Sequence, residues 1–114
     1  MKRNLKDKVV WITGAGSGIG QNAAITLSSL GMKVILSGRD EKKLNLTANQ
    51  CANQTKIKAL DVSKNEKVEQ VSAEIIKEFK KVDILINSAG INVERRDWDV
   101  INKKDWDSIF QTNV

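Results

Sequence analysis

The segment Val9–Gly20 reads VVWITGAGSGIG, an apolar run followed by a series of glycines. The apolar run ends at Thr13, and a helical pattern follows the glycines. The glycines are Gly14, Gly16, Gly18 and Gly20. Strand, glycine turn and helix in this order are typical of a nucleotide-binding unit, because glycines let the backbone turn sharply and approach a pyrophosphate. The N–H groups that open the helix would then face the phosphates.

Composition and charge narrow the class of protein. The 114 residues predict one domain, and the balance of 40% apolar and 29% charged residues is typical of soluble globular chains. No apolar run reaches the length of about 18 residues that a membrane span needs. The single cysteine, Cys51, favours a reducing compartment, so we expect a cytoplasmic protein. The chain has no histidine, which excludes histidine-based catalysis and histidine metal ligands; we expect no metal.

The net charge of +5 raises the possibility of a nucleic-acid-binding α/β domain. The lysines, however, are scattered in pairs and singles, and the few aromatic residues are not interleaved with a basic stripe. A solvated basic surface, which would also attract an anionic dinucleotide, is the favoured interpretation. We therefore expect no nucleic-acid partner.

Strand and helix patterns alternate along the chain, which predicts a parallel sheet built from βαβ units. The first helix is expected to carry Ile19, Ala23, Leu27 and Leu30 and to end at Gly31. Further strands are expected over residues 32–37, 56–62 and 82–86. A helix with Asp40 as its N-cap is expected to run to about Cys51, which is expected to be a small buried residue on its apolar face. Another helix is expected from a capping box of Ser63 and Glu66 to Phe79, with an amphipathic face of Val68, Val71, Ile75 and Phe79. A last helix is expected from Asn102 to the chain end.

Short, right-handed connections give these strands the order 3-2-1-4. The fold class is therefore a Rossmann-type doubly wound parallel sheet with three α/β/α layers. Strand 82–86 is apolar along both faces, as expected inside a parallel sheet. Nothing further along the chain is expected to pair beside it. An exposed apolar edge is a template for pairing, so we expect self-association or a homo-oligomer.

The glycine spacing is T-G-x-x-x-G-x-G, on Thr13, Gly14, Gly18 and Gly20, and not G-x-G-x-x-G. This longer pattern resembles the short-chain dehydrogenase/reductase family. The resemblance implies NAD(P)-dependent oxidation of a secondary alcohol or reduction of a carbonyl, with a 3-oxoacyl thioester among the possible substrates. It implies cofactor contacts from the loop residues Thr13, Gly14, Gly16, Ser17, Gly18, Ile19 and Gly20. Gly16 stands at a variable position, where we expect alanine or serine to be accepted.

The end of the second strand reads SGRD and bears on the choice of cofactor. In the family, an acidic residue at the position of Gly38 binds the adenosine ribose of NAD, whereas a basic residue just after it favours NADP. Here the acid is absent and Arg39 is present. A guanidinium fork can pair with a 2′-phosphate, so NADP is favoured, with NAD as the alternative. Family members that use NADP often carry a second basic residue in the glycine loop, where this chain has Ser17.

Three further matches to the family extend over the rest of the chain. Asp61 and Val62 resemble the pair that contacts the adenine, Asp61 by accepting from the exocyclic amine. The stretch Asn87-Ser88-Ala89-Gly90 resembles the family's NNAG, which stabilises the sheet and passes under the cofactor's ribose. Asn87, Ala89 and Gly90 are therefore also assigned to cofactor binding. Asn113 resembles the catalytic asparagine that holds a water in a proton relay.

The family's catalytic serine and its Tyr-x-x-x-Lys lie further downstream than Val114, and this chain contains no tyrosine. Residues 1–114 therefore match the cofactor-binding half of such an enzyme, either a fragment or a truncated reading frame. The alternative function is a catalytically inert dinucleotide-binding module. Continuation of the reading frame into a Tyr-x-x-x-Lys would favour the enzyme.

We expect the 114-residue chain by itself to bind NADPH without consuming it. Carbonyl reduction needs a proton donor within hydrogen-bond reach of the carbonyl oxygen, and neither tyrosine nor histidine is present. NADPH absorbance followed with ketones, aldehydes and 3-oxoacyl thioesters should stay constant. A steady, protein-dependent loss of absorbance that Asn113→Ala removes would contradict this expectation.

Overall fold

Four parallel strands form the central sheet of the computed structural model, which describes residues 5–61 and 63–88. They are β1 (Val9–Thr13), β2 (Lys33–Ser37), β3 (Thr55–Ile57) and β4 (Ile84–Asn87). Their order is β3-β2-β1-β4, which confirms the predicted topology. In the register, Val10 of β1 lies opposite Val34 on one side and Ile84 on the other. The central strand β1 is thus paired along both edges.

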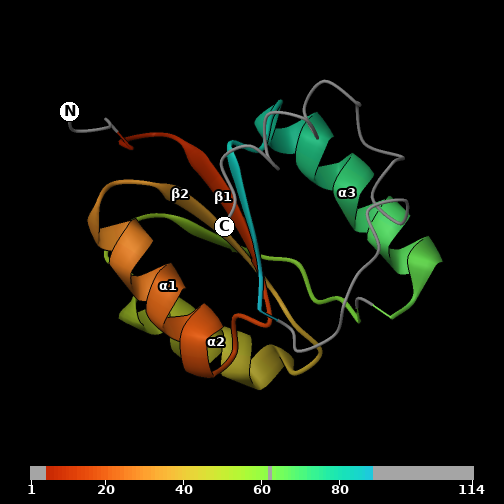
Figure 1. Ribbon diagram of the computed structural model, residues 1–114, viewed down its shortest axis with the longest axis horizontal. Coiled ribbons are helices and arrows are strands. Elements are labelled where there is room, and N and C mark those ends of the chain that lie inside the picture. Colours follow the sequence, from red (N-terminus) through yellow and green to blue (C-terminus); the bar gives the residue numbers. More distant parts are fainter. Residues whose placement is uncertain (1–4, 62, 89–114) are drawn as a thin grey trace.

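Helices cover both faces of this sheet. They are α1 (Gly18–Ser29), α2 (Glu41–Gln50) and α3 (Asn65–Phe79). Figure 1 shows α1 and α2 together on one face, with α3 alone on the opposite face. This is the predicted three-layer Rossmann-type arrangement, in which each connection crosses over the sheet between parallel strands.

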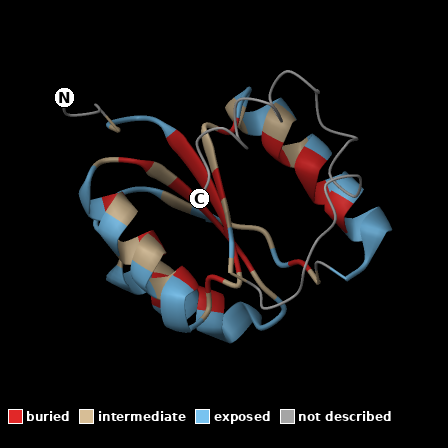
Figure 2. Cartoon of the chain, in the orientation of Figure 1, coloured by how far each residue is buried: buried red, intermediate tan, exposed pale blue. Residues whose placement is uncertain are grey.

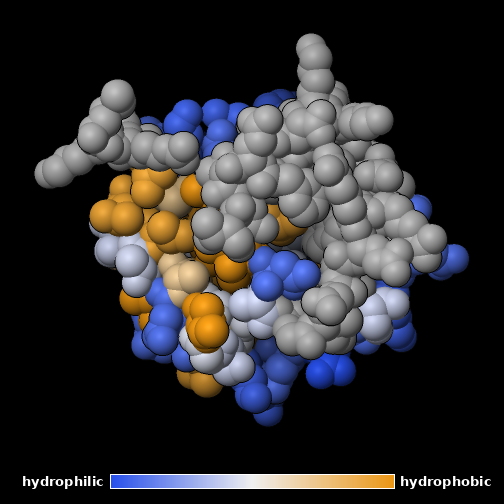
Figure 3. All heavy atoms as spheres, viewed as in Figure 1, coloured by the Kyte–Doolittle hydropathy of each residue, from blue (hydrophilic) through white to orange (hydrophobic). Residues whose placement is uncertain are grey.

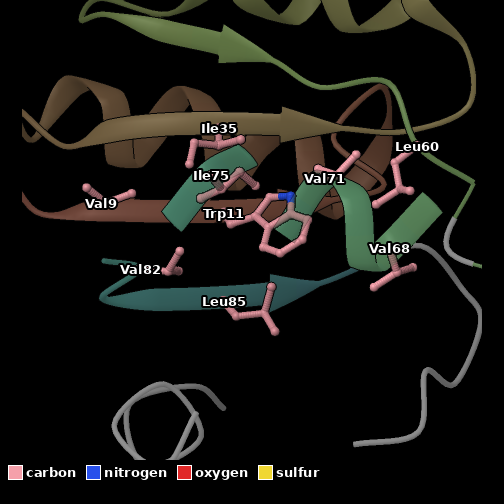
Figure 4. Close-up of a cluster of buried hydrophobic side chains, with 9 residues drawn as sticks. All are labelled: Val9, Trp11, Ile35, Leu60, Val68, Val71, Ile75, Val82 and Leu85. Atoms are coloured by element: carbon pink, nitrogen blue, oxygen red, sulfur yellow. The ribbon is translucent and has the colours of Figure 1, made fainter. Parts of the chain in front are cut away.

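The apolar run of β1 is buried on both sides because each side of the sheet has its own core. Val9 and Trp11 pack toward α3, where they meet Val68, Val71 and Ile75. Figure 4 shows this cluster, with the Trp11 ring lying among side chains from the sheet and α3. The alternate residues of β1, Val10 and Ile12, pack on the α1 and α2 side with Val34, Leu36 and Leu44. Continuous burial of this kind explains why the strand reads as an unbroken apolar run.

The helices bury one side and expose the other, as the colours of Figure 2 show. In α3 the buried residues are Val68, Val71, Ser72 and Ile75, which confirms its predicted amphipathic face. Lys58, just after β3, pairs with Glu74 and Glu78 of α3 at 3.2 and 3.4 Å. These ion pairs connect α3 to the sheet outside the apolar contact.

Gly31 ends α1 as predicted. Its φ of +89° is left-handed, and its N–H donates to the Ser28 carbonyl oxygen at 3.0 Å. The N–H of Met32 donates to the Leu27 carbonyl oxygen at 3.2 Å. This pair of hydrogen bonds is a Schellman motif, which turns the chain directly into β2.

The inward face of α1 differs from the prediction. Ile19 and Leu30 are 79% and 53% exposed, and the buried residues are Gly20, Ala24 and Ser28. Small residues at this spacing face the sheet because the glycine loop brings the start of α1 close to the strand ends. Figure 3 shows hydrophobic residues, mixed with hydrophilic ones, at the surface on the side of the molecule where α1 lies.

Three other predictions need correction. The expected strand 56–62 is only Thr55–Ile57, although the N–H groups of Lys58 and Leu60 still donate to Leu36 and Gly38. The last strand runs over Ile84–Asn87 instead of residues 82–86. The capping box is wrong, because the hydroxyl of Ser63 donates to Asp61 and Lys64 stands at the N-cap without a side-chain bond. The helix predicted from Asn102 lies outside the described residues.

The predicted helix cap at Asp40 is confirmed, since its Oδ1 accepts the N–H groups of Lys42 and Lys43. The buried face of α2 consists of Leu44 and Thr47. Partly buried Cys51 packs at the edge of the same core, as expected, and burial raises the pKa of its thiol, which suits a structural role. In the described part of the chain, no helix is long and apolar enough to cross a membrane.

A buried hydrogen bond fixes α2 to the glycine loop. The Thr47 hydroxyl donates to the Ala15 carbonyl oxygen at 2.9 Å, and both residues are fully buried. Leu44, one turn earlier, lies beside Gly38, where an added Cβ would stand 3.2 Å from Leu44 Cδ2. The position of α2 is therefore set by one contact with the glycine loop and one with the loop after β2.

Thr47→Val should lower the free energy of unfolding by about 1–3 kcal/mol, because it leaves the Ala15 carbonyl buried without its donor. Chemical denaturation measures this loss. Thr26→Val makes the same change at an exposed position of α1 and should stay within about 0.5 kcal/mol of the unmodified chain. Equal effects of the two substitutions would show that the buried hydrogen bond does not hold α2.

Candidate functional site

A groove lies at the carboxyl ends of the strands, with a volume of about 210 Å³. Loops that follow β1, β2, β3 and β4 all contribute to it. Its lining residues are Gly14, Gly16, Ser17, Gly38, Arg39, Asp40, Lys43, Leu44, Leu60, Asp61 and Ser88. In open parallel sheets, ligands bind at this edge, where the strand order reverses. The volume is below the range typical of a whole ligand pocket.

Gly14, Gly18 and Gly20 are required in the glycine loop, by backbone conformation at the first two and by close packing at the third. Gly14 and Gly18 have φ values of +68° and +58°, a region that L side chains rarely adopt. At Gly20, an added Cβ would overlap the Gly14 carbonyl oxygen and the Ser88 hydroxyl. At Gly18, a Cβ would meet no atom of the described chain within 4 Å, so the space above this residue is open. The loop is therefore closely packed from below and accessible from above.

Gly16 does not match the expectation that alanine or serine would be accepted there. A Cβ at this position would lie 2.9 Å from Lys43 Cβ, closer than real Cβ contacts. The neighbour is the root of a side chain on a helix, and it cannot move aside without moving α2. Gly16 is thus needed for the contact between the loop and α2, which the sequence spacing alone did not reveal.

The ends of β1 and β4 are tied together beneath the loop. The buried Thr13 hydroxyl donates to Asn87 Oδ1 at 2.8 Å. The Ser88 hydroxyl and its N–H both donate to the Thr13 carbonyl oxygen, at 2.6 and 3.1 Å. Thr13 and Asn87, which the family pattern assigns to cofactor binding, therefore position the loop through strand-to-strand contacts. Ser88 replaces the family's asparagine and performs part of this linkage.

The start of α1 faces the groove with its N–H groups. Ser17 is the N-cap, its side chain makes no capping hydrogen bond, and the residue lines the groove. No acidic residue stands in the first turn, so the positive end of the helix dipole is not neutralised there. Ile19, in the same turn, is the most exposed large apolar side chain of the described residues. An anion and an apolar group could both be held at this end of α1.

Arg39 and Asp61 face the groove from the ends of β2 and β3. Oδ1 of Asp61 accepts from the Ser63 hydroxyl at 2.6 Å and from the Ser63 N–H at 3.0 Å. These hydrogen bonds, with a smaller contribution from the positive charge of Arg39, hold the pKa of Asp61 below its usual value. Asp61 is therefore ionised at neutral pH and can act only as a hydrogen-bond acceptor.

The structure brings most of the residues predicted from sequence to this edge of the sheet. Val62, Ala89, Gly90 and Asn113 lie outside the described residues. Six lining residues were not assigned to the site from the sequence: Gly38, Asp40, Lys43, Leu44, Leu60 and Ser88. For Lys43 no local signal was available, because its place beside the loop depends on the contact between α2 and Gly16.

Comparison with known proteins agrees with the fold and with the geometry of the groove. A family model described as short chain dehydrogenase matches residues 8–114. The chain belongs to this family. The membership confirms the resemblance that the glycine spacing indicated, and the short-chain dehydrogenase pattern accounts for the T-G-x-x-x-G-x-G loop observed here.

Relatives of this chain include an uncharacterized oxidoreductase of Staphylococcus aureus (strain MRSA252), 40% identical over 113 residues. That match covers 96% of this chain and 48% of the relative. An uncharacterized oxidoreductase of Staphylococcus epidermidis is 34% identical over 110 residues, covering 96% of this chain and 47% of the relative. The chain thus spans about half the length of the curated relatives it matches.

Two solved structures resemble the described fold closely. A short-chain dehydrogenase/reductase from Burkholderia phymatum in complex with NAD has a TM-score of 0.68 and is 33% identical, covering 74% of this chain and 31% of that protein. A metagenomic short-chain oxidoreductase in complex with NADP has a TM-score of 0.75 and is 26% identical, covering 87% and 50%. The family's solved structures therefore include complexes with either dinucleotide.

Gly18→Ala should weaken NADPH binding at least about tenfold, because its methyl group would occupy the open space above the loop. The left-handed backbone adds a folding cost of about 1–2 kcal/mol. Fluorescence titration and thermal unfolding separate the two effects.

Gly31→Ala is the matched control, since Gly31 also has a left-handed φ of +89° but lies at the far end of α1. It should lose comparable stability and keep its affinity for NADPH. Undiminished NADPH binding by Gly18→Ala would show that the ligand lies elsewhere.

Proposed function

We propose that this chain forms the cofactor-binding part of an NADP-dependent oxidoreductase that reduces a carbonyl or oxidises a secondary alcohol. The observation that carries the proposal is the groove in which the glycine loop and Arg39 meet without a carboxylate at position 38. A carboxylate there would repel a 2′-phosphate, whereas a guanidinium binds it through paired hydrogen bonds.

Each part of a dinucleotide has a matching group along the groove. The pyrophosphate would lie over Gly18, where the space is open and the N–H groups of α1 point outward. The adenine amine would donate to the ionised Asp61, whose Oδ1 is already held in place by Ser63. The 2′-phosphate would lie beside Arg39. The loops after β1, β2 and β3 would thus contact the pyrophosphate, the 2′-phosphate and the adenine, respectively. This is also the order of the three groups along NADP.

The nicotinamide supplies or accepts the hydride when the cofactor is bound. The residues described here would hold that cofactor and fix its orientation. Thr13, Asn87 and Ser88 would keep the loop at a fixed height above the ends of β1 and β4. Asn113, which lies outside the described residues, is proposed as the holder of a water in the proton relay by its resemblance to the family. A carbonyl or secondary alcohol as the substrate is likewise proposed for the whole protein.

Arg39→Ala should weaken NADPH binding by more than about tenfold, because one charge-assisted phosphate contact is worth about 1.5–3 kcal/mol. NADH has no 2′-phosphate, so its affinity should be unchanged. Titration of both cofactors by fluorescence measures the ratio.

Lys77→Ala removes an exposed cation from the last turn of α3, on the opposite face of the sheet, and controls for net charge. It should leave the ratio of the two affinities unaltered. An equal preference for NADPH and NADH in the unmodified chain, unaffected by Arg39→Ala, would rule out the proposed role.

A further inference from the structure

A second cation faces the groove beside Arg39. Lys43 lines the same groove, although it belongs to the first turn of α2 and not to the loop after β2. The root of its side chain lies against Gly16, since a Cβ at Gly16 would be 2.9 Å from Lys43 Cβ. The lysine stem therefore starts at the wall of the glycine loop. Its ammonium group is on an exposed side chain that can reach over the groove.

The location of Lys43 is fixed by the contacts of α2. Thr47, one helical turn later on the same face, donates to the Ala15 carbonyl oxygen at 2.9 Å. Leu44 is fully buried beneath Gly38. The helix cannot rotate or slide without breaking one of these contacts. The direction in which Lys43 leaves the helix is thus determined by the fold, unlike that of a lysine on a free surface.

The charges around Lys43 favour an anion on this side of the groove. Arg39 and Lys43 carry two positive charges, and the groove also holds two carboxylates, Asp40 and Asp61. Oδ1 of Asp61 accepts two hydrogen bonds from Ser63. Oδ1 of Asp40 already accepts the N–H groups of Lys42 and Lys43, which engages its carboxylate with the helix end. A lysine in the first turn of a helix is at the unfavourable end of the dipole. An anion bound beside Lys43 would offset the repulsion between its ammonium group and the positive end of the α2 dipole.

We propose that Lys43 is a second cation for the 2′-phosphate of NADP, acting together with Arg39 and determining cofactor specificity. The inference rests on the proposed function and adds a residue to it. Arg39 supplies a planar pair of donors, and Lys43 supplies a point charge on a flexible stem that starts in the first turn of α2. Ser17, the loop residue next to Gly16, carries no charge, so the positive charge on this side comes from α2.

Lys43→Ala tests the proposal in the full 114-residue chain, with adenosine 2′,5′-bisphosphate and 5′-AMP as probes. The two nucleotides differ only in the 2′-phosphate. Lys43→Ala should weaken binding of the bisphosphate roughly three- to tenfold and change that of 5′-AMP less than about twofold. Lys43→Arg should restore most of the loss, because it keeps the charge.

Lys42→Ala is the matched control, since Lys42 is the exposed neighbour in the same turn and does not line the groove. It should alter neither affinity. If Arg39→Ala weakens the bisphosphate while Lys43→Ala behaves like Lys42→Ala, the second cation is refuted and the proposed function stands. An equal loss for both nucleotides in Lys43→Ala would also refute it. An unmodified chain that binds the bisphosphate no more tightly than 5′-AMP would overturn both.

Discussion

The close approach of the glycine loop to its neighbours is the constraint on which the site depends. At Gly20 the loop touches its own start at Gly14 and the end of β4 at Ser88, with no room for a Cβ. At Gly16 it touches α2, again without room. A loop packed this closely from below holds its upper side, with the N–H groups of α1, in a fixed position. Preorganised donors of this kind bind an anion without a cost of reorganisation.

The sheet provides the frame for that loop. Because β1 is paired on both edges and buried on both faces, its end at Thr13 is among the most constrained positions in the described chain. Hydrogen bonds from Ser88 and to Asn87 extend the constraint across to β4. On the other side, the Ala15 N–H donates to the Ser37 carbonyl oxygen at 3.0 Å and continues the pairing with β2. The loop is therefore anchored to both neighbouring strands where it leaves the sheet.

Short-range patterns in the sequence correctly predicted the features that depend on neighbouring residues in the chain. The left-handed Gly31, the cap at Asp40 and the apolar face of α3 follow from backbone conformation, short-range hydrogen bonds and helical period. The order of the strands follows from short right-handed connections. The glycine spacing was enough to indicate the family.

The features that the sequence did not predict depend on contacts formed in the folded structure. Ile19 is exposed because the close packing at Gly20 turns the small residues of α1 inward. Ser63 fits a capping box in sequence, but the nearby carboxylate of Asp61 accepts its hydroxyl instead. Lys43 lines the groove because α2 packs against Gly16, and Lys43 and Gly16 are 27 residues apart in the chain. Contacts of that separation are set by the tertiary structure and leave no periodic signal.

The function proposed for this site requires that a dinucleotide binds over the glycine loop at the carboxyl ends of the strands. Backbone amide NMR of the chain titrated with NADPH tests it most directly. The account predicts shifts at residues 14–20 and 38–44, and unchanged amides at Lys56 and Phe79, which border a smaller depression elsewhere on the surface. Shifts centred on that depression, or none in the glycine loop at saturating NADPH, would contradict it.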